Sequence, residues 1–396
     1  MTRAIFKTSL IASALFLAAC SSDNNSNNND EIKAPISGVA IQTVNSDYTS
    51  GQEVVVLDSQ SFEITTDGIG KTLVKTDYSI KTYQDDIYHI GKFGIDTIEK
   101  FTAENLQNSA YSFSTQQAGE EASGNPYDIV FVNEEKAFVI RYGSDKVLII
   151  NPSATQDSEF IIGSIDLSAY NTEKGEPTAA DGLIHDDKLY VIMQRLDAAW
   201  APETAYVAIF DVQTGEEIET NANSEDTLKG IPLNGTNPQQ DSLTVYGENL
   251  YVTTHAPYSA TDISASKIEK ISLNNYALTE VLNATDIEGN TTGLINESVI
   301  VNDEQGYFYV SGGWPAVSSL YQFNPSTGEI TQADIAATAI NNEGIADIAL
   351  DTENRLWISV SNAATPGVDV YSVEDNSLLE NRITTDLPPT RVEFLF

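Results

Sequence analysis

Short apolar runs separated by polar turns recur along most of the chain. The pattern is clearest at residues 126–131, 136–143 and 147–150, where an Asn-Glu-Glu turn and a Gly-containing loop divide three apolar runs. Runs of about four to eight residues bounded by turn residues are typical of β-strands. No segment has a sustained helical period. The pattern therefore predicts an all-β protein.

The same order of strands returns at intervals along the chain. Each copy opens on an acidic residue followed by an apolar strand, and its second strand carries an aromatic residue near its middle. Successive opening acids are 51, 53, 60, 56 and 50 residues apart, a period that suits a four-stranded antiparallel blade with variable loops. These six first-strand acids are Asp77, Asp128, Asp181, Asp241, Glu297 and Asp347.

The two ends of the chain supply a seventh copy in two pieces. Residues 38–44, 53–58 and 61–64 look like strands two to four of a blade, and residues 389–396 look like a first strand. Joining them closes the ring and removes exposed sheet edges. We therefore predict one domain, residues 36–396, folded as a seven-bladed β-propeller in which the C-terminal strand pairs with the N-terminal blade. The alternative is six blades with a separate N-terminal hairpin.

One copy carries a resemblance to a known family. The sequences Asn-Pro-Tyr-Asp-Ile-Val-Phe at residues 125–131 and Lys-Ala-Phe-Val-Ile-Arg-Tyr-Gly-Ser-Asp-Lys-Val-Leu-Ile-Ile-Asn-Pro at residues 136–152 resemble YVTN-type or YncE-like propeller proteins. The resemblance implies the propeller fold. One periplasmic relative of this kind is linked to DNA, and other surface lipoproteins with propeller folds capture ferric siderophores or glycans beside outer-membrane transporters.

The first twenty residues have the pattern of an export signal. Two basic residues precede an apolar run at residues 10–16, which is too short for a membrane-spanning helix. The Leu-Ala-Ala-Cys sequence at residues 17–20 resembles a bacterial lipobox, and Cys20 is the chain's only cysteine. This resemblance implies cleavage before Cys20 and attachment of lipid to it. Residues 1–19 are therefore expected to form a lipoprotein signal peptide.

The segment that begins at Cys20 is expected to be a flexible tether. Residues 20–35 are rich in Asn and Ser and carry too little apolar surface to fold. Ser rather than Asp follows the cysteine, which by the lipoprotein resemblance implies the outer membrane as destination. We therefore expect a protein that lies at the cell outer membrane and is held there through its lipid anchor alone.

The net charge of the chain restricts the classes of binding partner that we expect. The chain has 58 acidic and 20 basic residues and a formal net charge of −38. Removing residues 1–19 takes away two basic residues, so the mature chain carries −38 − 2 = −40. Such a field repels nucleic acid and anionic lipid. We expect no nucleic-acid partner, which also argues against the DNA-linked role of the family relative.

Scarce cations lie among aromatic residues in loops expected on one face of the propeller. The start of strand one and the loop between strands two and three share this face, and three of the five arginines of the mature chain fall there. Arginine offers forked donors to carboxylate or phosphate and stacks on rings, while aromatic side chains supply rigid apolar area. The pattern predicts ligand-binding roles for Arg141, Tyr142, Arg195, Trp200, His255, Tyr258, Trp314 and Arg391.

The leading functional hypothesis is a lipid-anchored binding protein. Its propeller face would hold a small anionic or aromatic ligand, for example a ferric siderophore, and pass it to a membrane partner. The alternatives are a protein-interaction scaffold at the cell envelope and a hydrolase or lyase that uses carboxylates of the first-strand acids. These acids could also bind a cation, or they could bond neighbouring backbone N–H groups.

Enzyme signatures are mostly missing from the sequence. The three histidines fall at unlike positions in their blades, so a histidine-rich metal centre or a Ser-His-Asp site is not expected. No Gly-rich phosphate loop and no EF-hand-like run is present. We therefore predict a protein without a cofactor and favour a binding role over catalysis.

Overall fold

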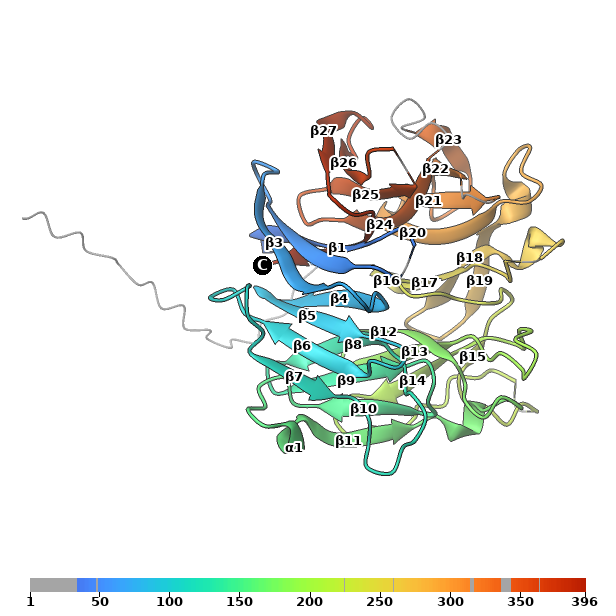
Figure 1. Cartoon of the computed structure of the whole chain (residues 1–396). Coiled ribbons are helices and arrows are strands. Elements are labelled where there is room, and N and C mark those ends of the chain that lie inside the picture. Colours follow the sequence, from blue (N-terminus) through green and yellow to red (C-terminus); the bar gives the residue numbers. More distant parts are fainter. Residues whose placement is uncertain are drawn as a thin grey trace, which may run out of the picture. The chain divides into compact units, whose positions relative to one another are not determined.

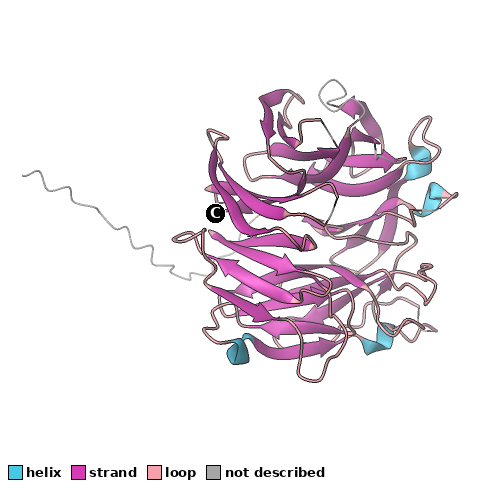
Figure 2. Cartoon of the chain, viewed as in Figure 1, coloured by secondary structure: helices cyan, strands magenta, loops and turns pink. Residues whose placement is uncertain are grey.

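Seven four-stranded antiparallel sheets make up the part of the chain that the structure describes (Figures 1 and 2). The structure is a computed structural model, and it describes residues 34–47, 49–223, 225–258, 260–313, 317–335, 343–362 and 364–396. Strands account for nearly all the regular structure, and the helices are single short turns. No helix within these residues is long and apolar enough to cross a membrane.

The sheets follow one another along the chain, and each contains consecutive strands except the first, which also recruits the last strand. Their strands are β28 (Pro389–Leu395), β1 (Gly38–Val44), β2 (Gln52–Asp58) and β3 (Ile64–Thr72); β4 (Tyr78–Tyr83), β5 (Asp86–Gly91), β6 (Thr97–Phe101) and β7 (Tyr111–Ser114); β8 (Pro126–Asn133), β9 (Lys136–Arg141), β10 (Lys146–Ile150) and β11 (Ile161–Asp166); and β12 (Ala179–His185), β13 (Lys188–Met193), β14 (Tyr206–Asp211) and β15 (Ile231–Pro232).

The last three sheets repeat the same order. They contain β16 (Leu243–Tyr246), β17 (Asn249–Thr254), β18 (Lys267–Ser272) and β19 (Leu278–Asn283); β20 (Leu294–Asn302), β21 (Gln305–Gly312), β22 (Val317–Phe323) and β23 (Ile330–Ile335); and β24 (Gly344–Leu350), β25 (Arg355–Asn362), β26 (Gly367–Ser372) and β27 (Leu378–Thr384). The short helices are α1 (Asp157–Phe160), η1 (Ser168–Tyr170), η2 (Ile263–Ala265) and η3 (Ala284–Asp286).

The C-terminal strand closes the ring. β28 pairs antiparallel with β1, from Gly38 opposite Leu395 to Gln42 opposite Arg391. The innermost strands contact one another in the order β28, β4, β8, β12, β16, β20 and β24, and β24 contacts β28 again. The predicted seven-bladed propeller is therefore confirmed, and the six-bladed alternative is wrong because the N-terminal strands complete a seventh sheet.

The core lies between adjacent blades, which explains why the strands read as unbroken apolar runs. In β9, Phe138 and Ile140 pack toward the following blade, whereas Ala137 and Val139 pack toward the preceding one. All four side chains are fully buried. Successive side chains of a strand point to opposite faces of its sheet, so a sheet covered on both faces needs apolar residues at nearly every position.

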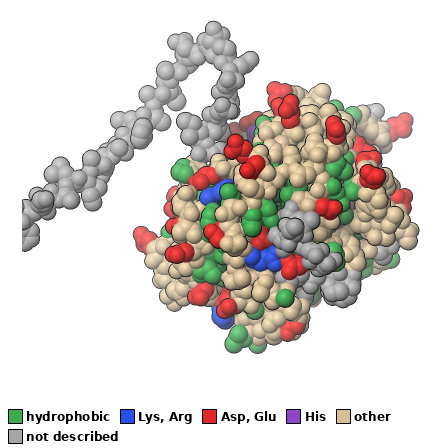
Figure 3. Space-filling view, turned by 90° about the horizontal axis from the view of Figure 1, so that it is seen from above, with side chains coloured by type: hydrophobic (Ala, Val, Ile, Leu, Met, Phe, Trp, Pro, Cys, Tyr) green, Lys and Arg blue, Asp and Glu red, His purple; other side chains and the backbone are tan. Residues whose placement is uncertain are grey.

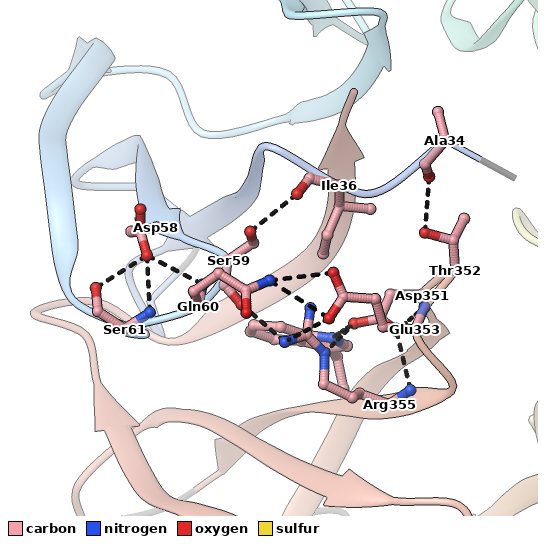
Figure 4. Close-up of polar contacts among 11 residues, drawn as sticks. Ala34, Ile36, Asp58, Ser59, Gln60, Ser61, Asp351, Thr352, Glu353 and Arg355 are labelled. Atoms are coloured by element: carbon pink, nitrogen blue, oxygen red, sulfur yellow. Dashed lines mark hydrogen bonds and ion pairs between the residues drawn. The ribbon is translucent and has the colours of Figure 1, made fainter.

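The N-terminal segment joins the propeller on the face opposite to the first-strand acids. Ser59 donates to the carbonyl of Ile36 at 2.9 Å, and Thr352 donates to the carbonyl of Ala34 at 3.0 Å. The guanidinium of Arg355 lies within 2.8 Å of the carbonyl of Ser59 (Figure 4). These groups sit where innermost strands end and where strand three of a blade turns into strand four. The predictions for residues 1–19, for Cys20 and for most of the tether lie outside the described residues.

Candidate ligand-binding site

Backbone bulges aim the first-strand acids toward the axis of the ring. In four blades the strand-one register shifts by one residue just before the acid, at Asp128, Asp181, Glu297 and Asp347. The closing sheet has a similar irregularity beside Arg391. A β-bulge inserts one residue and re-aims the neighbouring side chain. We refer to the face where these strands begin as the channel face.

Three of these acids tie each blade to the next. In these three blades one carboxylate oxygen accepts a hydrogen bond from a backbone N–H of the innermost strand of the next blade, at 2.8–3.0 Å. The pairs are Asp181 with Leu243, Glu297 with Ile348, and Asp347 with Val392. The sequence predicted bonds to neighbouring backbone N–H groups as one alternative; in these pairs the N–H group belongs to the next blade.

Charged side chains form a chain across the axis. The carboxylate of Asp128 lies 3.7 Å from the ammonium of Lys81, which lies 3.4 Å from Glu393. Glu393 accepts from Nε of Arg391 at 3.0 Å, and Nη2 of Arg391 lies 2.5 Å from Asp241. Lys81 and Arg391 are thus each shared by two carboxylates, which lessens but does not cancel the negative charge at the axis.

A compact group of three carboxylates remains at the end of this chain. Oxygen atoms of Asp241, Glu297 and Asp347 all lie within 4.8 Å of one another. Burial raises the pKa of Asp347 to about 8, and the nearby Asp241 carboxylate adds to this rise. Burial, together with Asp347, also raises the pKa of Glu297 well above its ordinary value. Among the ion pairs of the described residues, none involves Glu297 or Asp347.

Two cavities open at this place and share part of their walls. The floor cavity, of about 310 Å³, is lined by the three carboxylates together with Arg391 and residues from six blades in all. The rim cavity, of about 490 Å³, is lined mainly by aromatic, proline and amide side chains. Tyr127, Gln239 and Tyr258 line both cavities, so the two form one pocket with an acidic floor and an aromatic rim.

The rim carries stacked rings and exposed aromatic surface. The rings of Tyr127 and Tyr142 stack with centroids 4.6 Å apart, and the Tyr142 hydroxyl donates to Oε1 of Gln194 at 2.6 Å. Trp200 is 61% exposed and Tyr258 is 79% exposed, although both line the rim cavity. Large exposed aromatic side chains around a cavity are typical of recognition surfaces.

Lysine ammonium groups lie over two of the rim aromatics. Nζ of Lys92 is 4.1 Å from the centre of the Tyr127 ring, and Nζ of Lys174 is 3.6 Å from the centre of the Trp200 ring. The negative ring face attracts a cation. These two rim aromatics therefore already make cation–π contacts with lysines of the protein itself.

The structure brings together only part of the predicted ligand site. Tyr142, Trp200 and Tyr258 line the rim cavity, and Arg391 lines the floor cavity. The ring of His255 packs against that of Tyr258 at 4.3 Å, and its Nδ1 lies 2.7 Å from the carbonyl of Ala256. Trp314 lies outside the described residues.

Two of the predicted arginines lie outside the walls of both cavities. Arg141 is fully buried, and its Nη1 and Nη2 donate to Glu120 at 2.7 and 3.0 Å. Arg195 pairs with Glu203 at 3.1 Å and donates to the carbonyl of Tyr170. Both arginines therefore pair with loop glutamates and not with first-strand acids.

Several pocket residues were not among the predicted site residues. They are amides and a lysine of loops at the channel face, together with one tyrosine of the best-matching blade: Lys92, Tyr127, Gln194, Gln239 and Asn296. The sequence contains a signal for one of these residues, Tyr127. Tyr127 directly precedes the first-strand acid of its blade, and the bulge at this point turns the two neighbours to different surroundings.

The fold and the pocket define a seven-bladed β-propeller with a cavity at its channel face. No protein-family profile and no curated protein matches the chain. Among solved structures, the chain is similar to a candidate 6-phosphogluconolactonase from Bacteroides uniformis, with a TM-score of 0.60, 11% identity and coverage of 90% of this chain and 99% of that one.

Two further solved structures are similar over the same length. A protein from Lactobacillus plantarum has a TM-score of 0.60 and 16% identity, covering 91% of this chain and 100% of that chain. A candidate 6-phosphogluconolactonase from Bacteroides fragilis has a TM-score of 0.59 and 11% identity, covering 93% and 100%. At these identities the likeness shows the fold alone.

Proposed function

We propose that this chain is a cell-envelope binding protein that holds a small ligand with an aromatic part at its channel face. The observation that carries the proposal is the pair of cavities joined by Tyr127, Gln239 and Tyr258. Pockets of roughly 300–1,000 Å³ with aromatic walls and a few polar groups are typical of small-molecule sites. The exposed rings of Trp200 and Tyr258 supply apolar contact area at the rim.

The envelope part of the proposal comes from the N-terminal sequence. We propose that Cys20 carries the lipid and that residues 20–35 tether the propeller to the outer membrane. The position of Ala34 and Ile36 on the face opposite to the pocket supports this arrangement. A tether attached there leaves the channel face open to solvent, where it can take up a ligand and present it to a membrane partner.

The charge of the pocket favours the aromatic half of the sequence-based hypothesis over the anionic half. An anionic ligand such as a ferric siderophore was expected to use Arg141, Arg195 and Arg391. Arg141 and Arg195 are paired with glutamates away from the cavity walls, and Arg391 is shared by Asp241 and Glu393. The floor beneath the aromatic rim carries more carboxylates than cations.

A scaffold role has separate support on the same face. Leu73, Val74 and Phe93 are 70%, 82% and 68% exposed, and they lie in loops at the channel face. Exposed apolar side chains beside a pocket are typical of protein contact sites. Figure 3 shows acidic side chains scattered over one face of the protein, and the whole chain carries a formal net charge of −38, whereas Lys71, Lys75 and Lys92 are close sequence neighbours of these apolar residues.

Ligand-observed NMR with neutral 4-ethylphenol tests the binding function. We expect saturable binding of this probe to the full chain in detergent, and weaker binding after Trp200→Ala together with Tyr258→Ala. The matched control is Phe93→Ala, which removes an exposed aromatic ring that lines neither cavity. Absent binding, or equal loss in the control, would contradict the proposal. Recovery of a stoichiometric protein that the Phe93→Ala variant no longer captures would favour the scaffold.

A further inference from the structure

We infer that the pocket takes an aromatic amine, with its ammonium group on the three floor carboxylates and its ring against the rim. The inference rests on the proposed function and deepens it, because it names the chemical class of the ligand. It follows from three features: buried carboxyl groups of the floor that form no ion pair, the number of oxygen atoms that meet there, and the aromatic wall that continues from them.

The first feature is a pair of buried carboxyl groups that form no ion pair. Glu297 and Asp347 are 8% and 5% exposed, both line the floor cavity, and neither has an ion-pair partner among the described residues. Each uses one carboxylate oxygen for a backbone N–H of the next blade. Buried carboxylates are costly unless they are paired with a cation, so a positively charged group in this cavity gains two unpaired acceptors.

The second feature distinguishes an ammonium group from a metal ion. A primary ammonium has three N–H donors, and three carboxylates contribute one oxygen each within 4.8 Å of one another. A calcium ion takes about six to eight oxygen ligands and magnesium about six, so either ion would need several water molecules beside the three carboxylates. In addition, the guanidinium of Arg391 lies 2.5 Å from Asp241. A fixed positive charge at this point disfavours a divalent ion more than a monovalent one.

The third feature is continuity between floor and rim. Tyr127 and Tyr258 border both cavities, so a ligand held at the carboxylates extends directly along aromatic walls. The rim adds Trp200 and two prolines, Pro202 and Pro257, which offer flat apolar surface to a ring. An aliphatic amine or an inorganic cation would leave this surface unused.

Three probes that share one phenol ring test the inference. Tyramine carries an ammonium group, 4-ethylphenol is neutral, and 3-(4-hydroxyphenyl)propionate carries a carboxylate. We expect the full chain to bind tyramine at least about tenfold more tightly than 4-ethylphenol, and the carboxylate probe more weakly than either. The dissociation constants are measured by ligand-observed NMR or calorimetry at pH 8.5, where tyramine is still a cation.

A variant that removes one negative charge from the floor tests whether the floor carboxylates cause the preference for tyramine. Glu297→Gln keeps an oxygen for the N–H of Ile348 but removes the charge, so we expect the tyramine preference over 4-ethylphenol to fall to about threefold or less. The matched control is Glu216→Gln, an exposed glutamate in a turn on the opposite face, which should leave the preference unchanged. Urea midpoints of both variants verify that they are folded.

The possible outcomes separate the two claims. Equal affinity for tyramine and 4-ethylphenol overturns the amine inference and leaves the binding function standing. Tightest binding of the carboxylate probe overturns it in favour of an anionic ligand. Micromolar binding of calcium or magnesium alone, in competition with tyramine, assigns the floor to a metal. Failure of all three phenols to bind overturns both the inference and the proposed function.

Discussion

Replacing Asp347 by Asn should make the propeller more stable, and the gain should grow with pH. Asp347 is 5% exposed, and one of its oxygens accepts from the N–H of Val392 at 2.8 Å. Asn keeps a carbonyl oxygen for this bond, so the tie between the two blades is retained. What the substitution removes is the ionised form of a carboxylate that lies close to Asp241 and Glu297.

The size and sign of the effect follow from the pKa of Asp347. Burial raises this pKa from its ordinary 3.8 to about 8, so the folded protein holds a proton that the unfolded chain has released. Relative to a fold with ionised Asp347, the bound proton stabilises the fold fully below pH 3.8, and this stabilisation is lost as the pH rises through 8. Fully ionised, Asp347 costs the fold roughly 6 kcal/mol at most. The Asn NH₂ group needs a hydrogen-bond acceptor, and this lowers the stability that the Asn variant gains by roughly 1–3 kcal/mol.

Urea unfolding at pH 5, 7 and 9 measures the effect. We expect the free energy of unfolding of Asp347→Asn to be close to that of the wild type at pH 5 and higher by roughly 3–5 kcal/mol at pH 9. Tryptophan fluorescence, to which the fully buried Trp357 contributes, and far-ultraviolet circular dichroism should report the same transition. A gain that is no larger at pH 9 than at pH 5, or a loss at pH 9, would refute the reasoning.

Three further changes test other parts of the structure. Arg141→Met should lower the free energy of unfolding by roughly 2–4 kcal/mol, because Glu120 loses its forked partner; an unchanged urea midpoint would contradict the structural role of this arginine. Deleting residues 389–396 removes β28 and opens the ring, so near-ultraviolet circular dichroism should be lost, and a retained cooperative transition would argue against closure by this strand. Trp200→Ala should change stability by less than about 0.5 kcal/mol because the ring is 61% exposed, yet weaken tyramine binding several-fold; equal affinity would remove Trp200 from the site.

The propeller could be predicted from the sequence because each blade repeats one local pattern. The first-strand acids, the unbroken apolar strands and the turns between them recur every 50 to 60 residues. The unmatched strands at the two ends then required a closing pair, which β28 and β1 provide. Burial of both faces of every sheet forces this pattern, so the sequence retains it even where identity between blades is low.

The pocket could be predicted in position but only partly in composition. Tyr142, Trp200, Tyr258 and Arg391 lie in its walls, as loop placement suggested. The side chain of Arg141 has the same sequence context but turns to Glu120, a loop residue 21 positions earlier. Which of two nearby surfaces a long side chain reaches depends on loop geometry, and the repeat pattern contains no information about that geometry.

The first-strand acids affect the protein in two ways, through a hydrogen bond between blades and through their charge. One oxygen of Asp181, Glu297 or Asp347 holds the next blade, and this bond needs an acceptor but not a charge. The raised pKa of Asp347 indicates that its charge opposes folding. An amide would satisfy the blade contact at lower cost, so the architecture alone does not account for carboxylates at the floor. A cationic ligand would offset the cost, which is why amide variants at these positions separate the structural contribution from the binding one.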